Sequence, residues 1–183
     1  NNGCSTSTTK TLSTIYAEPQ AGFSAPAEIC LGSAVNFIDQ SAATGSSVAQ
    51  WNWDFGDGSN SISNNPSHTY SIPGTYTVKL NVTSANGCQT VNNFATHAVV
   101  VNALPVADFN VSAPACANSN ITFNDASLAK AGSLTKWTWD FGDGNTSSLT
   151  SGSPFGHIYS TGGSYNATLS VETNKGCKSA LKT

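Results

Sequence analysis

The sequence contains few charged residues and no methionine. Asp, Glu, Lys and Arg make up 9% of its 183 residues, against about a quarter in an average soluble domain. The net charge is −3, so there is no basic patch and nucleic acid is not an expected partner. No apolar run approaches the roughly 20 residues that cross a bilayer, so no membrane span is predicted.

Motifs for catalysis and for zinc binding are also missing from the sequence. No Gly-x-Ser-x-Gly nucleophile motif accompanies the three histidines. There is no Cys-x-x-Cys pair and no Cys/His cluster, which structural zinc sites need. No stretch of a dozen residues keeps the apolar stripe of a helix. The sequence therefore predicts a non-catalytic protein that has no cofactor and no helices.

A long internal repeat is the main feature that the sequence does contain. The hexapeptide Trp-Asp-Phe-Gly-Asp-Gly occurs at residues 53–58 and again at residues 139–144. A fixed long period indicates repeated structural units. The match extends on both sides to the pairs Phe23/Phe109, Cys30/Cys116, Phe37/Phe123, Trp51/Trp137, His68/His157, Tyr76/Tyr165 and Cys88/Cys177.

The repeat divides the chain into three segments. We expect residues 23–104 and 105–183 to form two tandem domains, called below the first and the second repeat. Residues 1–22 are expected to be the tail of a preceding repeat and a linker. The second repeat has no counterpart of the apolar stretch 98–102. It is therefore expected to lack its last strand and to expose a sheet edge.

Apolar residues alternate with polar ones in each repeat, which predicts strands with one buried face. The alternation is clear at residues 35–39, 51–55 and 76–82. Trp53 and its counterpart Trp139 are expected to point into the core. Short strands separated by turn-forming residues at this spacing predict an all-β sandwich.

The order of these motifs resembles the PKD domain. In each repeat the hexapeptide is followed by His-x-Tyr, at residues 68–70 and 157–159, and then by a Gly-x-Tyr that opens an alternating strand. The resemblance covers nearly all of residues 23–183. It implies two immunoglobulin-like β-sandwiches in an elongated array. It also implies a non-catalytic family whose members serve as spacers, adhesive modules and appendages of extracellular enzymes.

Structural roles are expected for the repeated motif residues. The motif glycines permit the positive φ that a tight turn needs. Each Tyr resembles a sandwich-corner tyrosine whose hydroxyl bonds the backbone. The family motif places each His in a turn, with its ring bonded to the backbone. The residues expected to be structural are Trp53, Asp54, Gly56, Asp57, Gly58, His68, Tyr76, Trp139, Asp140, Gly142, Asp143, Gly144, His157 and Tyr165.

The paired aspartates of the motif allow two other readings. Two nearby carboxylates can do acid–base chemistry, but this spacing is that of a strand end and a turn. Calcium takes about six to eight oxygen ligands. The loops at Asp57 and Asp143 supply too few by themselves. We therefore expect no metal, with calcium at these loops as the alternative.

The cysteines predict an oxidising environment. Cys30 and Cys88 are placed like Cys116 and Cys177, which predicts one disulfide inside each repeat, Cys30–Cys88 and Cys116–Cys177. Cys4 matches Cys88, so we expect it to be unpaired within this chain. Disulfides persist in extracellular proteins, so the sequence predicts a secreted or cell-surface protein.

Two functions are compatible with these observations. The first is a structural or adhesive repeat module of a longer surface protein or fibre. Its partners would be neighbouring repeats or subunits, joined by chain continuation or by strand addition through residues 11–17, and further candidates are surface glycans or other cell-surface proteins. The second is an accessory spacer or substrate-binding segment of a secreted protease or glycosidase. A dedicated glycan platform is less supported, because only Tyr16, Phe94 and Phe155 lie outside the paired aromatic positions.

Overall fold

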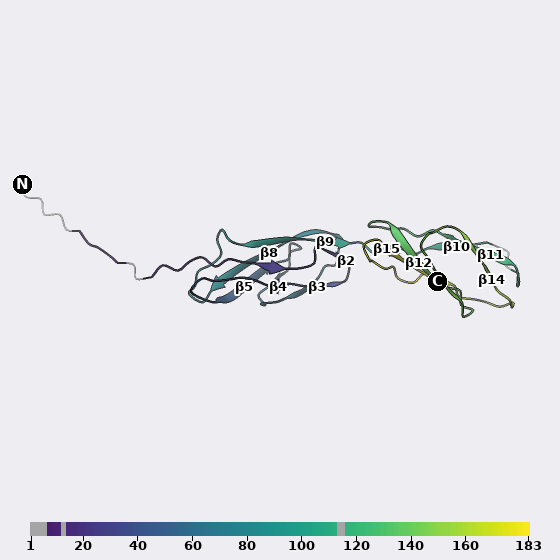
Figure 1. The fold of residues 1–183 in the computed structure, drawn as a ribbon, viewed down its shortest axis with the longest axis horizontal. Helices are drawn as coiled ribbons and strands as arrows, with labels where there is room; N and C mark the ends of the chain where they lie inside the picture. The colour runs from purple at the N-terminus through teal and green to yellow at the C-terminus, as the bar shows by residue number, and fades with distance from the viewer. Residues whose placement is uncertain (1–6, 12–13, 113–115) are drawn as a thin grey trace, which may run out of the picture. The chain divides into compact units, whose positions relative to one another are not determined.

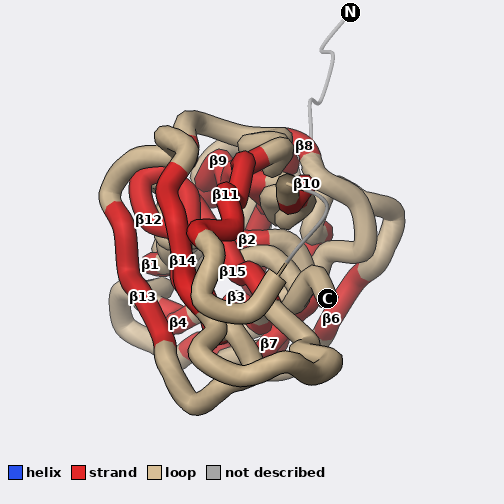
Figure 2. The backbone as a smooth tube through the Cα atoms, turned by 90° about the vertical axis from the view of Figure 1, so that its right-hand side faces the viewer, coloured by secondary structure: helices blue, strands red, loops and turns tan. Residues whose placement is uncertain are grey.

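A computed structural model describes residues 7–11, 14–112 and 116–183. Every regular element among these residues is a strand, which confirms the predicted all-β class (Figure 2). None of them belongs to a helix long and apolar enough to cross a bilayer. Two compact units are formed, one from residues within 1–25, 36–66 and 77–97, the other from residues within 26–35, 67–76 and 98–183. Cys4 lies outside the described residues.

The first repeat is built around one large sheet with the strand order β2-β9-β8-β5-β6. Figure 1 labels β2, β9, β8 and β5 of this sheet. Smaller pairs, β1 with β4 and β3 with β7, accompany it. Phe37 lies between β3 and β4, and its amide donates to the carbonyl of Pro66 at 3.0 Å. The strands are β1 (Phe23–Ser24), β2 (Glu28–Cys30), β3 (Ala34–Asn36), β4 (Ile38–Asp39), β5 (Val48–Asp54), β6 (Asn60–Ser61), β7 (Ser67–Thr69), β8 (Gly74–Ser84) and β9 (Ala95–Asn102).

The second repeat has two sheets, with the orders β10-β11-β14 and β13-β12-β15. Trp139 of β12 is in register with Leu169 of β15, as Trp53 of β5 is with Leu80 of β8. The same pairing in both repeats is the structural counterpart of the sequence repeat. The strands are β10 (Phe109–Val111), β11 (Asn120–Asp125), β12 (Leu134–Asp140), β13 (Thr146–Leu149), β14 (Phe155–Ile158) and β15 (Thr168–Thr173).

Aromatic side chains from the alternating strands form the cores. Trp53 and Trp139 are 0% and 1% exposed, which confirms that both are buried. Around Trp139, the rings of Phe109 and Phe123 lie 5.0 and 5.4 Å away, centroid to centroid, in edge-on arrangements that aromatic pairs prefer. Trp51, two residues before Trp53 in β5, is only half-buried.

Strand β9 of the first repeat has no counterpart among the described residues 116–183. β9 lies between β2 and β8, and it runs parallel to β2 with Glu28 beside Val100. In the second repeat, residues 178–183 contribute only isolated bridges, one of them between Leu169 and Lys182. Strand β9 therefore joins β2 to β8 in the sheet of the first repeat.

Candidate functional site

The repeated Trp-Asp-Phe-Gly-Asp-Gly motif forms a self-contained turn after strands β5 and β12. In the first repeat, the carboxylate of Asp54 accepts the amide of Gly56 at 2.9 Å, and that of Asp57 accepts the amide of Ser59 at 3.0 Å. Asp140 and Asp143 make the same bonds at 2.9 and 3.0 Å to the amides two residues later. These carboxylates therefore fix the turn, which supports the structural reading of the motif.

The glycines of this turn are required by the backbone. Gly56 has a φ of 80° and Gly142 a φ of 74°, in the left-handed region that glycine alone adopts freely. A Cβ atom on Gly56 would lie 2.7 Å from the carbonyl oxygen of Thr77. On Gly142 it would lie 2.8 Å from the carbonyl oxygen of Asn166. Gly58 also has positive φ, as predicted, but faces open space.

The histidines are placed differently from the prediction. His157 lies in strand β14, not in a turn, and its Nε2 is 2.8 Å from a carboxylate oxygen of Asp143. Its ring stacks on Phe141 with centroids 4.0 Å apart. The predicted backbone partner is therefore wrong for His157: its ring nitrogen contacts a side chain of the motif turn. His68 lies in β7, and its ring packs edge-on against Tyr70 at 4.6 Å.

Asp143 is the most strongly perturbed acid of this turn. Partial burial raises the pKa of its carboxyl, but hydrogen bonds from Asn145 and His157 outweigh that effect and lower the pKa to about 2. The side chains of Asp143 and His157 are 13% and 15% exposed. The carboxylate is thus held charged by donors that tie the turn to the neighbouring strand.

The corner tyrosines behave as predicted. The hydroxyl of Tyr76 donates to the carbonyl of Ile72 at 2.8 Å, and that of Tyr165 donates to the carbonyl of Thr161 at 3.0 Å. Each ring also stacks on the Tyr of the His-x-Tyr motif, with 4.2 Å between the centroids of Tyr70 and Tyr76. The tyrosines therefore close the corner of each sandwich.

Among residues 7–11, 14–112 and 116–183, no three His, Cys, Asp or Glu side chains gather closely enough to hold a metal ion. The third histidine, His97, has no counterpart in the second repeat. It lies in β9 but is half-buried, and its ring is 6.1 Å from that of Phe23. Its Nε2 is buried without a hydrogen-bond partner.

The disulfide pairing corrects the prediction. Cys30 is bonded to Cys177, with 147 residues between them in sequence and 5.5 Å between their Cα atoms. Cys88 and Cys116 are free thiols. The predicted pairs Cys30–Cys88 and Cys116–Cys177 are therefore wrong. The bridge joins a cysteine of the first repeat to one of the second, and both lie in the same compact unit.

The direction of the strands explains the correction. Cys30 is in register with Asn102, the last residue of β9. Cys88 follows the end of β8, in the connection that leads to the start of β9. Since β9 has eight residues, a rise of about 3.3 Å per residue separates its ends by over 20 Å. A disulfide needs Cα atoms within about 7 Å, so Cys30 and Cys88 cannot meet.

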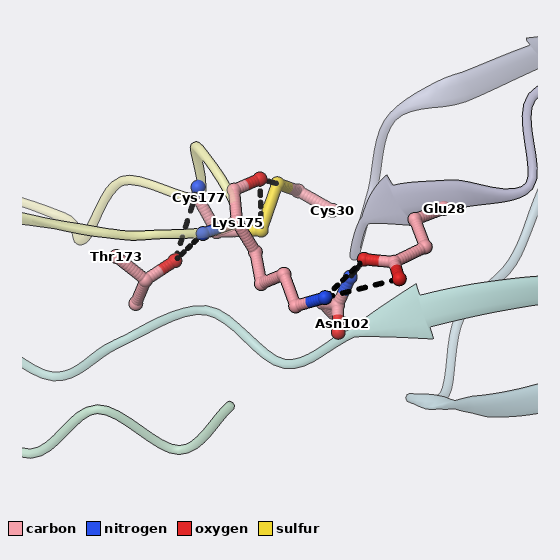
Figure 3. The surroundings of a disulfide bond; sticks show 6 residues. All are labelled: Glu28, Cys30, Asn102, Thr173, Lys175 and Cys177. Carbon is pink, nitrogen blue, oxygen red and sulfur yellow. Dashed lines mark hydrogen bonds and ion pairs between the residues drawn. A yellow bond between two sulfur atoms is a disulfide. The ribbon is translucent and has the colours of Figure 1, made fainter. Parts of the chain in front are cut away.

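Polar contacts surround the bridge (Figure 3). The ammonium of Lys175 lies 2.8 Å from a carboxylate oxygen of Glu28, and Asn102 donates to the same carboxylate at 3.4 Å. The hydrogen bond from Lys175 is the main cause that lowers the pKa of Glu28. The side chain of Lys175 is 38% exposed and that of Glu28 is 46% exposed. Sequence reasoning missed this ion pair, because neither residue belongs to a repeated motif.

Tight turns position both bonded cysteines. Cys177 is 1% exposed, and its amide donates to the hydroxyl of Thr173 at 3.3 Å. Gly176 reverses the chain just before it with a φ of 75°. Cys30 begins another turn, in which its carbonyl accepts the amide of Ser33 at 3.0 Å. The sulfur atoms are thus presented by backbone geometry that other residues fix.

Comparison with known proteins gives the family. The PKD domain matches residues 16–99 and 102–183. A microbial collagenase of Vibrio alginolyticus is 34% identical over 87 residues, which is 47% of this chain and 10% of that protein. Collagenase ColA of Clostridium perfringens is 32% identical over 126 residues, 68% of this chain and 11% of that protein. The chain thus spans about a tenth of the length of these relatives.

Two PKD domains are among the solved structures to which this chain is similar. The PKD1 domain of Vibrio anguillarum Epp is 29% identical, with a TM-score of 0.42, and the match covers 48% of this chain and 96% of that domain. The PKD1 domain of the Vibrio cholerae metalloprotease PrtV is 27% identical, with a TM-score of 0.41, and covers 46% and 98%. Because the family match covers both repeats, the chain belongs to the PKD domain family.

Proposed function

We propose that this chain is a non-catalytic extracellular repeat module of a longer surface protein or fibre, in which disulfides join consecutive repeats. The observation that carries the proposal is the Cys30–Cys177 bridge, which takes one cysteine from each repeat. A bridge of this kind restrains one repeat against the other, as a spacer under load requires. It also fits an oxidising compartment outside the cell.

The two free cysteines support the same organisation. Cys88 occupies the turn that corresponds to that of Cys177: its amide donates to the Ser84 hydroxyl at 3.2 Å, and Gly87 precedes it with a φ of 83°. Cys116 corresponds to Cys30, and its carbonyl accepts the amide of Ser119 at 3.1 Å. Each free thiol is therefore presented like a bonded one. Further repeats would supply their partners.

The test uses two copies of the chain as neighbours, both with Cys4→Ser. One copy carries Cys88→Ser and keeps Cys116, and the other carries Cys116→Ser and keeps Cys88. In a glutathione redox buffer, one thiol from each copy forms the new disulfide and oxidised glutathione is reduced to two thiols. We expect a heterodimer linked Cys88 to Cys116 in the mixture, and monomers in either variant alone.

Peptide mapping of the native Cys30–Cys177 bond is the control for folding in both copies. Equal amounts of homodimer and heterodimer would contradict the proposal, because random collision of exposed thiols would then explain the cross-link. A mixture that stays monomeric at high protein concentration would contradict it as well.

An adhesive role has a structural candidate. Trp51 lines a groove of about 710 Å³ together with the polar residues Gln50, Asn52, Asn81 and Gln89. A groove lined by an aromatic residue and by hydrogen-bonding groups suits the apolar faces and hydroxyls of a sugar. We propose surface glycans as the ligands. On a glycan array, the chain should bind, and Trp51→Ala should remove the binding. The control variant Asn145→Ala changes a residue of the second repeat and should bind like the wild type. If the chain bound no glycan, this ligand proposal would be wrong and only the spacer role would remain.

The second candidate is an accessory segment of a secreted hydrolase. The similar proteins favour it, because two of them are collagenases and one of the similar solved domains comes from a metalloprotease. This reading predicts saturable binding of the chain to fibrous protein substrates such as collagen, without cleavage. The spacer proposal predicts no such binding. A co-sedimentation assay with insoluble collagen therefore separates the two.

A further inference from the structure

The carboxylate of Glu18 is bound by three consecutive backbone amides. One of its oxygens accepts the amides of Val91, Asn92 and Asn93, the last two at 2.8 and 3.2 Å. Successive amides that converge on one oxygen form a nest, which favours an anion. The hydrogen bonds from Asn92 and Val91 lower the pKa of Glu18, so the carboxylate stays charged in neutral solution. The amides of residues 91–93 are thus a carboxylate-binding site that the chain itself fills.

These contacts fix the segment of residues 16–22, which leads into the first repeat. Glu18 lies in this segment, and the three amides lie in the connection between β8 and β9. The amide of Ala21 also donates to the carbonyl of Asn93 at 3.0 Å, so a second bond ties the segment to the same connection. The bonds between the Glu18 carboxylate and the amides of residues 91–93 are called the latch below.

The latched segment lies against a free thiol. The sulfur of Cys88 is 3.9 Å from the carbonyl oxygen of Tyr16, two residues before Glu18. Cys88 is half-buried, whereas the free cysteine Cys116 is exposed. The two thiols therefore differ in how easily another molecule can reach them.

The bonded cysteines show what lies at this place when a partner is present. Cys177 corresponds to Cys88, and Asn102 corresponds to Tyr16. Asn102 is in register with Cys30, the bonding partner of Cys177. By this correspondence, a partner cysteine for Cys88 would approach beside Tyr16. The latched segment therefore borders the route to the thiol.

We propose that the latch holds Tyr16 over Cys88 and thereby limits the reaction of this thiol with a partner cysteine. Release of the Glu18 carboxylate from the amides lets the segment move away from the sulfur. Leu104 takes the place of Glu18 in the second repeat, so the latch is not a repeated feature. The inference rests on the proposed function for the partner of Cys88, but its test uses a small reagent and no second chain, so the two can fail separately.

Alkylation by iodoacetamide measures how accessible each thiol is. The cysteine sulfur attacks as a thiolate, a carbon–sulfur bond forms and iodide leaves. The chain carries Cys4→Ser and keeps its disulfide, and peptide mass spectrometry follows Cys88 and Cys116 separately. Glu18→Ala should accelerate the alkylation of Cys88 at least about threefold and leave that of Cys116 unchanged. Equal acceleration of both thiols, or of neither, would overturn the inference.

Two further variants separate the latch from other causes. Gln20→Ala is the matched control, because this side chain is exposed in the same segment and Gln20 bonds Ala42 through its backbone. Cys88 should react in it as in the wild type. Glu18→Gln removes the charge but keeps an oxygen that accepts hydrogen bonds, so Cys88 should react more slowly than in Glu18→Ala. Equal rates in these two variants would overturn the inference, because the lost charge alone would explain them.

Hydrogen exchange measured by NMR tests the latch itself. The amides of residues 91–93 should exchange at least about threefold faster in Glu18→Ala than in the wild type, and the amides of β5 should be unchanged. Unchanged exchange at residues 91–93 would overturn the inference. If Glu18→Ala released Cys88 but the thiol formed no cross-link with a second chain, the proposed function would be wrong and the latch would stand.

Discussion

The bridge between Cys30 and Cys177 should make a large contribution to stability. We consider the double variant Cys30→Ser/Cys177→Ser, which removes the bond without altering the backbone. The bond closes a loop with a sequence separation of 147 residues. In the chain-entropy treatment, a loop of this length lowers the entropy of the unfolded chain enough to contribute about 5 kcal/mol at 25 °C.

The neighbouring ion pair cannot account for an effect of this size. Lys175 and Glu28 are more than one-third exposed, and exposed pairs contribute at most about 1 kcal/mol. The two introduced serine hydroxyls would also change the free energy of unfolding, because the one at residue 177 lies at a buried position. We therefore expect the free energy of unfolding to fall by about 5 kcal/mol, and by at least about 2 kcal/mol.

Urea unfolding followed by tryptophan fluorescence measures this difference. The control variant Cys88→Ser/Cys116→Ser also removes two thiols, but both are free in the structure, so it should unfold like the wild type. Wild-type protein in reducing buffer should match the double variant. The reasoning would be refuted if the double variant lost less than about 2 kcal/mol, or if the control variant lost as much as the double variant.

Four further outcomes are expected. Gly56→Ala should destabilise the first repeat by about 2 kcal/mol more than Gly58→Ala in urea unfolding, since both share positive φ but only Gly56 abuts a carbonyl. Trp53→Ala should cost about 3–5 kcal/mol through lost burial and a cavity, and an unchanged melting temperature would contradict this. The pKa of Asp143 is lowered from 3.8 to about 2, so the charged carboxylate stabilises the fold above pH 3.8 and this contribution is lost as the pH falls through 2. The variant Asp143→Asn should therefore lack this pH dependence in acid unfolding. EDTA should leave the melting temperature unchanged, whereas a drop of several degrees would indicate bound calcium.

Much of the fold could be predicted, because the features of the repeat and the alternation of apolar and polar residues depend on residues close together in sequence. The buried Trp53 and Trp139, the positive φ of Gly56 and the hydroxyl bonds of Tyr76 and Tyr165 all follow from neighbours in sequence. Each signal appears twice, so one copy supports the other. Such features need no knowledge of which strands lie side by side.

The disulfide could not be predicted in this way. Pairing within a repeat and pairing between repeats use the same two kinds of cysteine, so the repeat cannot distinguish them. The choice depends on the end of the sheet at which each cysteine lies, and the parallel pairing of β2 with β9 decides this. The contact of His157 with Asp143 was missed for a similar reason, since it joins a turn to a strand 14 residues later.

A bridge that takes one cysteine from each repeat has a consequence for how such proteins can evolve. A gene duplication that copies one repeat adds one cysteine of each kind. A row of n repeats then forms n − 1 bridges and leaves two cysteines over, one of each kind. Two repeats should give one bridge and two leftover thiols, and the described residues hold the Cys30–Cys177 bond with Cys88 and Cys116 free. Lengthening by duplication would therefore bring its own covalent connection, with no further mutation needed.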